Sequence, residues 1–157
     1  MRFFISLIAL VMLAVPAGAA VKVTGNPNHE EMLESDNPQL ERNKRLVYDT
    51  WRVVVEARQM DRADEFIHDD YIQHNPNAET GLEGMKAYFR QLGDPLPVKD
   101  RVQRPIVDIV AEDDLVVITF VDEREDPETG EPYTTTWFDM FRIEDGKIAE
   151  HWDGARR

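Results

Sequence analysis

The first half of the chain shows hydrophobic residues at helical spacing. Residues 37–58 predict a long amphipathic helix with one apolar stripe, which an asparagine caps before Pro38 at the first helical position. A shorter helix is predicted over residues 62–68. After an extended stretch that ends at a proline, a third helix is predicted to begin at a capping box, with Thr80 as its N-cap, and to end near Leu92.

The second half of the chain changes to a period of two, which predicts strands. Four strands are predicted, over residues 102–110, 115–121, 134–143 and 147–152, and the Asp-Gly pair at 145–146 indicates a hairpin. Helices that precede a run of strands are typical of an α+β domain, in which an antiparallel sheet packs against the helices. We therefore predict the α+β class.

The first residues predict a segment that directs export. A positive charge at Arg2 precedes an apolar run that a proline ends, and the small residues 17–19 have the form of a signal peptidase site. The run is shorter than the about 20 apolar residues of a membrane-spanning helix. We expect a signal peptide over residues 1–19, a flexible lead-in over 20–36 and one domain over 37–157, located in the periplasm or secreted. A retained N-terminal anchor is the alternative.

Composition limits the classes of partner. The chain has 157 residues, which suits one domain, and a formal net charge of −13. A strongly acidic chain repels phosphate backbones and anionic lipid surfaces, so we expect neither nucleic-acid binding nor membrane binding once the signal peptide is cleaved. Cysteine is absent from the sequence, which excludes disulfides and thiolate chemistry.

Two segments carry a longer signature. Residues 71–76 read YIQHNP and precede a Gly-Leu-Glu-Gly run at 81–84, and residues 138–153 contain the pattern D-x-x-R-x-x-x-G-x-I-x-E-H-W. On these motifs the chain resembles the SnoaL-like polyketide cyclases of the nuclear transport factor 2-like superfamily, over residues 38–153. The resemblance implies a cystatin-like cone, in which a curved antiparallel sheet wraps around about three helices and an apolar pocket. It also implies a homodimer.

Asp139 is the main candidate for chemistry. It lies between Phe138 and Met140 in a predicted strand. A carboxylate among apolar residues is costly unless it is paired or functional, and such surroundings suit a carboxyl group to acid/base chemistry. The resemblance implies that this aspartate is the acid/base residue of an intramolecular aldol closure. The structural alternative is that Asp139 pairs with an arginine such as Arg142 or caps a neighbouring strand.

His74 is the second candidate catalytic residue. It could orient a carbonyl group or relay a proton, or it could lock the turn before Pro76 through backbone hydrogen bonds. Alternation along a strand lets only one of the neighbours His151 and Trp152 point into the cone, and the sequence leaves open which. Eight side chains, which could equally be plain core, are candidates to line a pocket for a flat apolar ligand: Trp51, Tyr71, Tyr88, Phe89, Phe120, Trp137, His151 and Trp152.

One cluster has the ligand types of a zinc or manganese site, namely His68, Asp69, Asp70 and His74. Its spacing matches no familiar ligand pattern, and the two adjacent aspartates would diverge. We therefore predict no metal site. The resemblance likewise implies a reaction without a metal or organic cofactor, because the carbonyl groups of the substrate stabilise the enolate.

Two functions remain open. The first is a cofactor-free lyase or isomerase for a small apolar or aromatic carbonyl compound, with Asp139 as general acid/base and His74 assisting. The second is a noncatalytic ligand-binding or dimeric interaction module of the cell envelope. The export signal favours the second, as does strand 116–120, which lacks the histidine that family members often carry there. An open cavity with Asp139 unpaired would favour the enzyme, and a filled cavity with Asp139 in a salt bridge would favour the module.

Overall fold

A computed structural model describes residues 21–155, so the predicted signal peptide lies outside the described part. Five strands form one sheet in the order β1-β5-β4-β3-β2. Its strands are β1 (Ile67–Gln73), β2 (Ile106–Glu112), β3 (Leu115–Glu125), β4 (Pro132–Glu144) and β5 (Lys147–Asp153). The last four form the predicted antiparallel meander, whereas β1 pairs in parallel with the edge of β5. The α+β class is confirmed.

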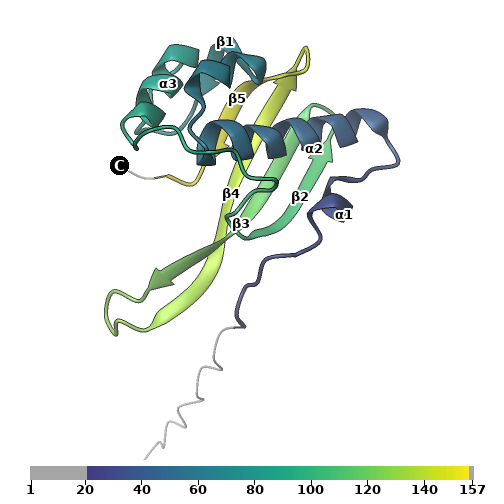
Figure 1. The fold of residues 1–157 in the computed structure, drawn as a ribbon. Helices are drawn as coiled ribbons and strands as arrows, with labels where there is room; N and C mark the ends of the chain where they lie inside the picture. Colours follow the sequence, from purple (N-terminus) through teal and green to yellow (C-terminus); the bar gives the residue numbers. More distant parts are fainter. Residues whose placement is uncertain (1–20, 156–157) are drawn as a thin grey trace, which may run out of the picture.

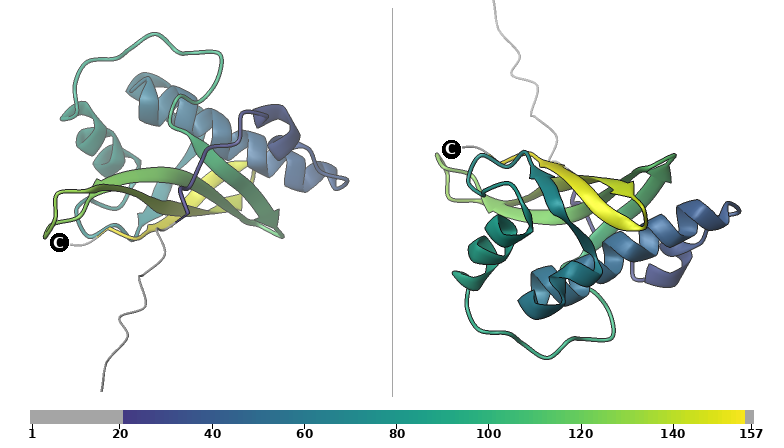
Figure 2. Two further views of the ribbon diagram at one scale, coloured as in Figure 1. Left: turned by 90° about the horizontal axis from the view of Figure 1, so that it is seen from below. Right: turned by 90° about the horizontal axis from the view of Figure 1, so that it is seen from above.

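The helices lie on one face of the sheet. Figure 1 shows α2 (Pro38–Thr50) crossing this face and α3 (Leu82–Arg90) beside it, while the long β3–β4 hairpin extends past the other strands. The two views in Figure 2 show the sheet curving around the helical side. A curved sheet with helices on its concave side is the cone that the family resemblance implies.

The first long helix begins as its sequence predicts. The Asn37 side chain accepts a hydrogen bond from the backbone N–H of Gln39, and Pro38 occupies the first turn. The predicted helix does not continue unchanged to its end. At Trp51 the winding loosens into a π-helix, η1 (Trp51–Glu56), so each residue after this point advances less around the axis than α-helical spacing predicts.

Two local predictions were wrong. The segment expected as a helix over 62–68 is a 3₁₀ turn, η2 (Met60–Glu65), and the chain is already in β1 at Ile67. The N-cap of α3 is Gly81, not Thr80. Gly81 has a φ of +92°, which a residue with a Cβ atom adopts only under strain. The Thr80 hydroxyl instead accepts a hydrogen bond from the Gln73 backbone at 3.1 Å, which ties the loop to β1.

The segment expected to be a flexible lead-in packs against the domain. It contains α1 (His29–Leu33), which buries Met32 and Leu33 in the core. The Tyr48 hydroxyl on α2 joins this helix to the loop before β2, since it lies 2.8 Å from His29 Nδ1 and accepts the Val102 backbone N–H at 3.1 Å. A stretch without hydrophobic period therefore still contributes to the core.

The core fills most of the space between the helices and the sheet. Its fully buried side chains include Val47, Val54, Ile106, Ile118 and Phe120.

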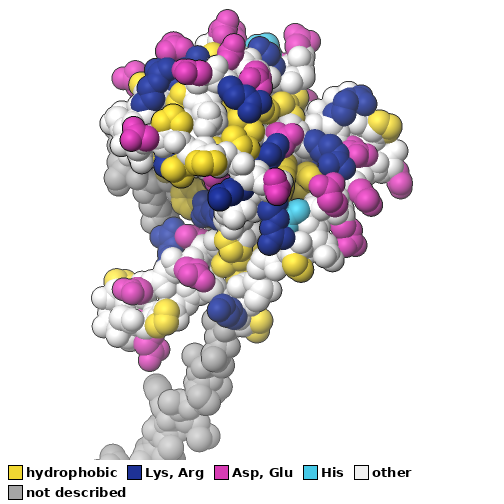
Figure 3. All heavy atoms as spheres, in the orientation of Figure 1, with side chains coloured by type: hydrophobic (Ala, Val, Ile, Leu, Met, Phe, Trp, Pro, Cys, Tyr) yellow, Lys and Arg dark blue, Asp and Glu magenta, His cyan; other side chains and the backbone are white. Residues whose placement is uncertain are grey.

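On the helix-bearing face, acidic side chains are spread over the surface rather than gathered in one patch (Figure 3). None of the helices within residues 21–155 is long and apolar enough to cross a membrane.

Candidate functional site

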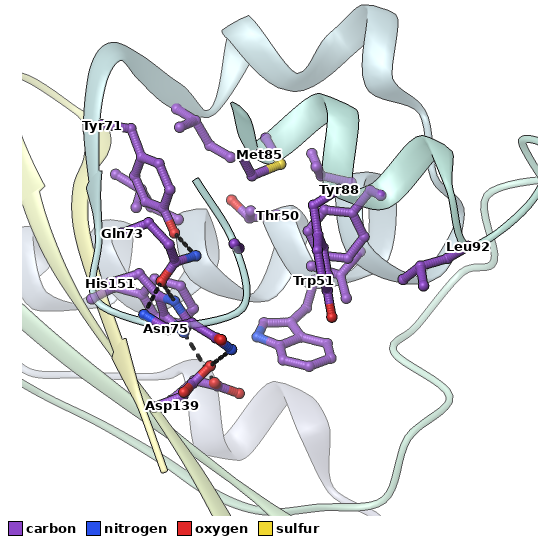
Figure 4. A pocket seen from close by; sticks show the side chains of 18 of the residues that line it. Thr50, Trp51, Tyr71, Gln73, Asn75, Met85, Tyr88, Leu92, Asp139 and His151 are labelled. Carbon is purple, nitrogen blue, oxygen red and sulfur yellow. Dashed lines mark hydrogen bonds and ion pairs between the residues drawn. The ribbon is translucent and has the colours of Figure 1, made fainter. Parts of the chain in front are cut away.

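A cavity of about 380 Å³ lies between the helices and the sheet. Most of its wall is apolar or aromatic: η1 supplies Trp51 and Val54, and α3 supplies Met85, Tyr88 and Phe89. Polar side chains from the strands and from the loop after β1 also line the cavity: Tyr71, Gln73, Asn75, Asp139, His151 and Asp153. Figure 4 shows the first five of them converging on one side. An apolar pocket with a few convergent polar groups is the usual form of a small-molecule site.

Asp139 lies at the centre of this polar side and is only 3% exposed. Alternation along β4 points Trp137, Asp139 and Phe141 inward, and the Trp137 indole N–H donates to Asp139 Oδ1 at 3.1 Å. His151 Nε2 lies 3.0 Å from the same oxygen. The other oxygen, Oδ2, is buried and has no hydrogen-bond partner among residues 21–155. Arg142, a partner considered from sequence, points to the opposite face of the sheet.

Gln73 determines that the Nδ1 atom of His151 carries a hydrogen. The Gln73 Oε1 atom accepts the backbone N–H of Asn75 at 2.9 Å, and a backbone nitrogen can only donate, so this atom must be the amide oxygen. His151 Nδ1 faces the same oxygen at 2.9 Å and must therefore carry hydrogen. His151 Nε2 is then directed at Asp139, and one further proton is shared between that nitrogen and the carboxyl group.

The amide nitrogen of Gln73 extends the chain of hydrogen bonds to Tyr71. It donates to the Tyr71 hydroxyl at 3.0 Å. Burial raises the pKa of Tyr71 well above its ordinary range, and the nearby charges of Asp139 and Asp153 raise it further, so the phenol stays neutral. On the other side, the Asn75 side chain donates to Asp153 Oδ2 at 2.6 Å. The polar side of the cavity is thus a connected network that holds Asp139 and His151 in place.

Seven of the ten side chains predicted for the site line the cavity: Asp139, Trp51, Tyr71, Tyr88, Phe89, Trp137 and His151. The remaining three do not. Phe120 is fully buried beneath the ring of Trp51, with the two ring centres 4.2 Å apart, and belongs to the core. The choice between His151 and Trp152 is settled, because His151 faces the cavity and Trp152 lies on the outer face of the sheet.

His74 also lies on the outer face, because its neighbour Gln73 takes the inward position. Its Nε2 atom is 2.7 Å from Glu150 Oε1, and its ring stacks on Trp152 at 4.9 Å. Arg142 donates to the second oxygen of Glu150 at 3.0 Å. These hydrogen bonds, first that of His74 and then that of Arg142, hold the pKa of Glu150 below its ordinary value. His74, Glu150 and Arg142 therefore form a network on the outer face of the sheet. We assign His74 no part in the chemistry proposed below.

Five polar cavity residues were missed from the sequence, namely Thr50, Gln73, Asn75, Arg104 and Asp153. Alternation from the buried Tyr71 would have placed Gln73 inward. The pairing of Asp139 with Asp153 across β4 and β5 depends on a register shift between Arg142 and Ile143, which the sequence does not signal. Arg104 carried no signal, because the strand predicted over 102–110 begins only at Ile106 and Arg104 lies in the loop before it.

One group of side chains has the composition and proximity of a metal site. The ligand atoms of Asp139, His151 and Asp153 lie within 4.8 Å of one another, the one such group in the part of the chain that the structure describes. The cluster considered from sequence is not brought together, since His68 donates to the backbone of Glu144 and His74 pairs with Glu150. In this arrangement the His151–Asp139 pair is a hydrogen bond, which would have to open to admit an ion.

The sequence of this domain matches a known family. The model of the SnoaL-like domain matches residues 47–151, which include every strand but the last residues of β5 and most of the cavity wall. The chain belongs to this family. The resemblance carried by the two motifs is therefore confirmed. A comparison of the SnoaL-like chain with curated proteins finds no sequence match.

Solved structures agree on the fold of the SnoaL-like domain. A predicted polyketide cyclase from Acidithiobacillus ferrooxidans is 19% identical, with a TM-score of 0.52, over 76% of this chain and 89% of that one. An LEH-like epoxide hydrolase from M. tuberculosis is 17% identical, with a TM-score of 0.51, over 74% and 84%. A protein with a cystatin-like fold from Xanthomonas campestris is 20% identical, with a TM-score of 0.50, over 71% and 88%. At these identities the likeness shows the fold alone.

Proposed function

We propose that the protein is a cofactor-free lyase or isomerase that moves a proton on a small carbonyl compound, with Asp139 as the general acid/base. One observation carries this proposal: a buried carboxyl group faces an open cavity with one oxygen held and the other free. Trp137 and His151 both bind Oδ1, which leaves the lone pairs of Oδ2 for a ligand. Buried carboxylate oxygens are rarely left unpaired without a functional reason.

The chemistry that fits is proton transfer next to a carbonyl group. Asp139 Oδ2 takes a hydrogen from the carbon beside the carbonyl, so a C–H bond breaks, an O–H bond forms and the substrate becomes an enolate. The carboxyl group then returns the proton to another atom, which completes an isomerisation. Alternatively, the enolate carbon attacks a second carbonyl of the same molecule, and the carboxyl group protonates the new alkoxide, which completes an aldol closure. His151 acts as a positioning residue, because its Nε2 atom holds Asp139 Oδ1 through a shared proton.

The cavity supports a small, largely apolar substrate. Its volume of about 380 Å³ is near the lower end of ligand pockets, which run from ~300 to ~1,000 Å³. The aromatic rings of Trp51, Tyr88 and Phe89 suit a flat or aromatic body. The fold is one in which both a predicted polyketide cyclase and an epoxide hydrolase occur, which agrees with small-molecule chemistry in the same cone. The proposal includes two further features. The N-terminal sequence supports export to the periplasm or beyond, and the family resemblance supports a homodimer.

Turnover by an Asp139→Asn variant tests this function. The amide keeps the shape of the side chain and can still bond to its neighbours, but it cannot take a proton from carbon. We expect the variant to fold and to lose turnover of small carbonyl compounds that the wild type converts. Asp122→Asn is the matched control, because Asp122 lies on β3 outside the cavity and pairs with Arg124. An Asp139→Asn variant as active as Asp122→Asn would overturn the proposal.

A further inference from the structure

A second unpaired polar atom lies at the same cavity. Within residues 21–155, two buried side-chain atoms have no hydrogen-bond partner, Asp139 Oδ2 and Trp51 Nε1, and both residues line the cavity. The indole nitrogen can only donate, whereas an ionised carboxylate can only accept. The cavity therefore offers one free acceptor and one free donor, and the proposed function uses only the acceptor.

The structure holds the Trp51 ring in a fixed orientation. Trp51 is the first residue of the π-helix, a type of turn that often occurs at functional sites, and its ring packs on the fully buried Phe120. Figure 4 shows the ring nitrogen pointing to the side of the cavity on which Asp139 and Asn75 lie. The free N–H is thus presented near the proposed base, inside the space that a ligand would occupy.

A positive charge lies against the same ring. The Arg104 guanidinium is 4.7 Å from the centre of the Phe120 ring and 5.9 Å from that of Trp51. Arg104 is the one Lys or Arg of the described residues that lines the cavity, and its guanidinium forms no hydrogen bond or ion pair within residues 21–155. Its loop is anchored, because the Glu56 carboxylate at the end of the π-helix accepts the backbone N–H of Arg104 at 2.8 Å.

We propose that Trp51 Nε1 and the Arg104 guanidinium form a subsite for a negatively charged oxygen of the ligand. Neither group donates a hydrogen bond to another residue of the described chain, and the guanidinium adds charge, so the subsite selects an anionic acceptor over a neutral one. The ligand class is a flat apolar body that carries an enolate or phenolate oxygen. Binding of an anionic oxygen at this subsite does not depend on the proposed function, whereas a catalytic role of the subsite does. In that role, negative charge develops on the carbonyl oxygen that these donors face as Asp139 removes the proton.

Binding of 4-nitrophenol tests the subsite directly, because its phenolate form absorbs visible light and can be distinguished from the neutral phenol. The titration uses Asp139→Asn protein as well as wild type, so it needs no turnover and its outcome is independent of the proposed base. We expect Trp51→Phe and Arg104→Gln each to weaken phenolate binding about tenfold or more, the usual range for a hydrogen bond to a charged group. Trp152→Phe, a matched change on the outer face, should bind as the wild type does.

Kinetics with an active substrate give a second readout. Trp51→Phe should lower kcat more than it raises KM, because the oxygen carries most charge in the transition state. Circular dichroism measures whether each variant is folded. If Trp51→Phe does not fold, Arg104→Gln still tests the subsite. The proposal is overturned if folded variants bind the phenolate as tightly as wild type, or if neither wild type nor Asp139→Asn binds it at millimolar concentration.

Discussion

Removing the amide of Gln73 should disturb the site without touching the proposed base. In Gln73→Leu the side chain keeps its approximate size, but His151 Nδ1 and the Asn75 backbone N–H lose their shared acceptor. The Tyr71 hydroxyl loses its donor as well. His151 is 8% exposed, so water replaces its lost acceptor poorly.

The expected cost follows from these contacts. A buried donor left without an acceptor costs about 1–3 kcal/mol, and the added apolar contact of leucine offsets only part of that. We expect a net loss of about 2 kcal/mol in the free energy of unfolding, or roughly 4–8 °C in Tm for a domain of this size. Freed from Gln73, His151 can rotate away from Asp139, which should lower kcat/KM by about 10- to 100-fold.

Urea unfolding and steady-state kinetics measure the two effects, with Gln91→Leu as control because Gln91 is exposed at the end of α3. A double-mutant cycle with His151→Phe shows whether Gln73 acts through His151, since the loss of activity should then be smaller in the His151→Phe background. A Gln73→Leu variant with wild-type stability and activity would refute the assigned network. Equal losses in both backgrounds would refute the part of His151.

Two further predictions concern pH and metals. Burial holds the pKa of His29 below its ordinary value of 6.5, so the unfolded chain takes up this proton first and stability should fall as the pH drops through that value. His29→Gln should therefore remove part of the difference in unfolding free energy between pH 7.5 and pH 5.5, and an unchanged difference would contradict the lowered pKa of His29. Since the proposed reaction uses no metal, activity should survive EDTA, and a loss restored by Zn²⁺ or Mn²⁺ would instead assign Asp139, His151 and Asp153 as ligands.

The sheet was well predicted because period-two alternation records which residues are buried. The four strands after residue 100 follow from that pattern, whereas the inward position of Asp139 does not, because apolar residues lie on both faces of β4 around it. The parallel pairing of β1 with β5 could not be predicted, because it joins segments distant in sequence and its register is interrupted between Ile67 and Ile72.

The errors at the site have local causes. His74 was chosen from its motif and its chemistry, but the buried Tyr71 fixes the phase of β1 and points Gln73 inward instead. The unpaired indole of Trp51 was likewise invisible in the sequence. Its orientation depends on the change from α- to π-helical winding and on contact with Phe120, which no spacing rule encodes.

The central claim is that Asp139 Oδ2 removes a proton from carbon, and hydrogen exchange measures that step alone. NMR in D₂O follows the exchange of the hydrogens next to the carbonyl of 2-tetralone, a flat ketone with an apolar body. We predict that the wild type accelerates this exchange above buffer and that Asp139→Asn lowers the enzymatic rate by about 10²- to 10⁴-fold, the usual contribution of a general base. Equal acceleration by wild type and a folded Asp139→Asn variant would contradict the account.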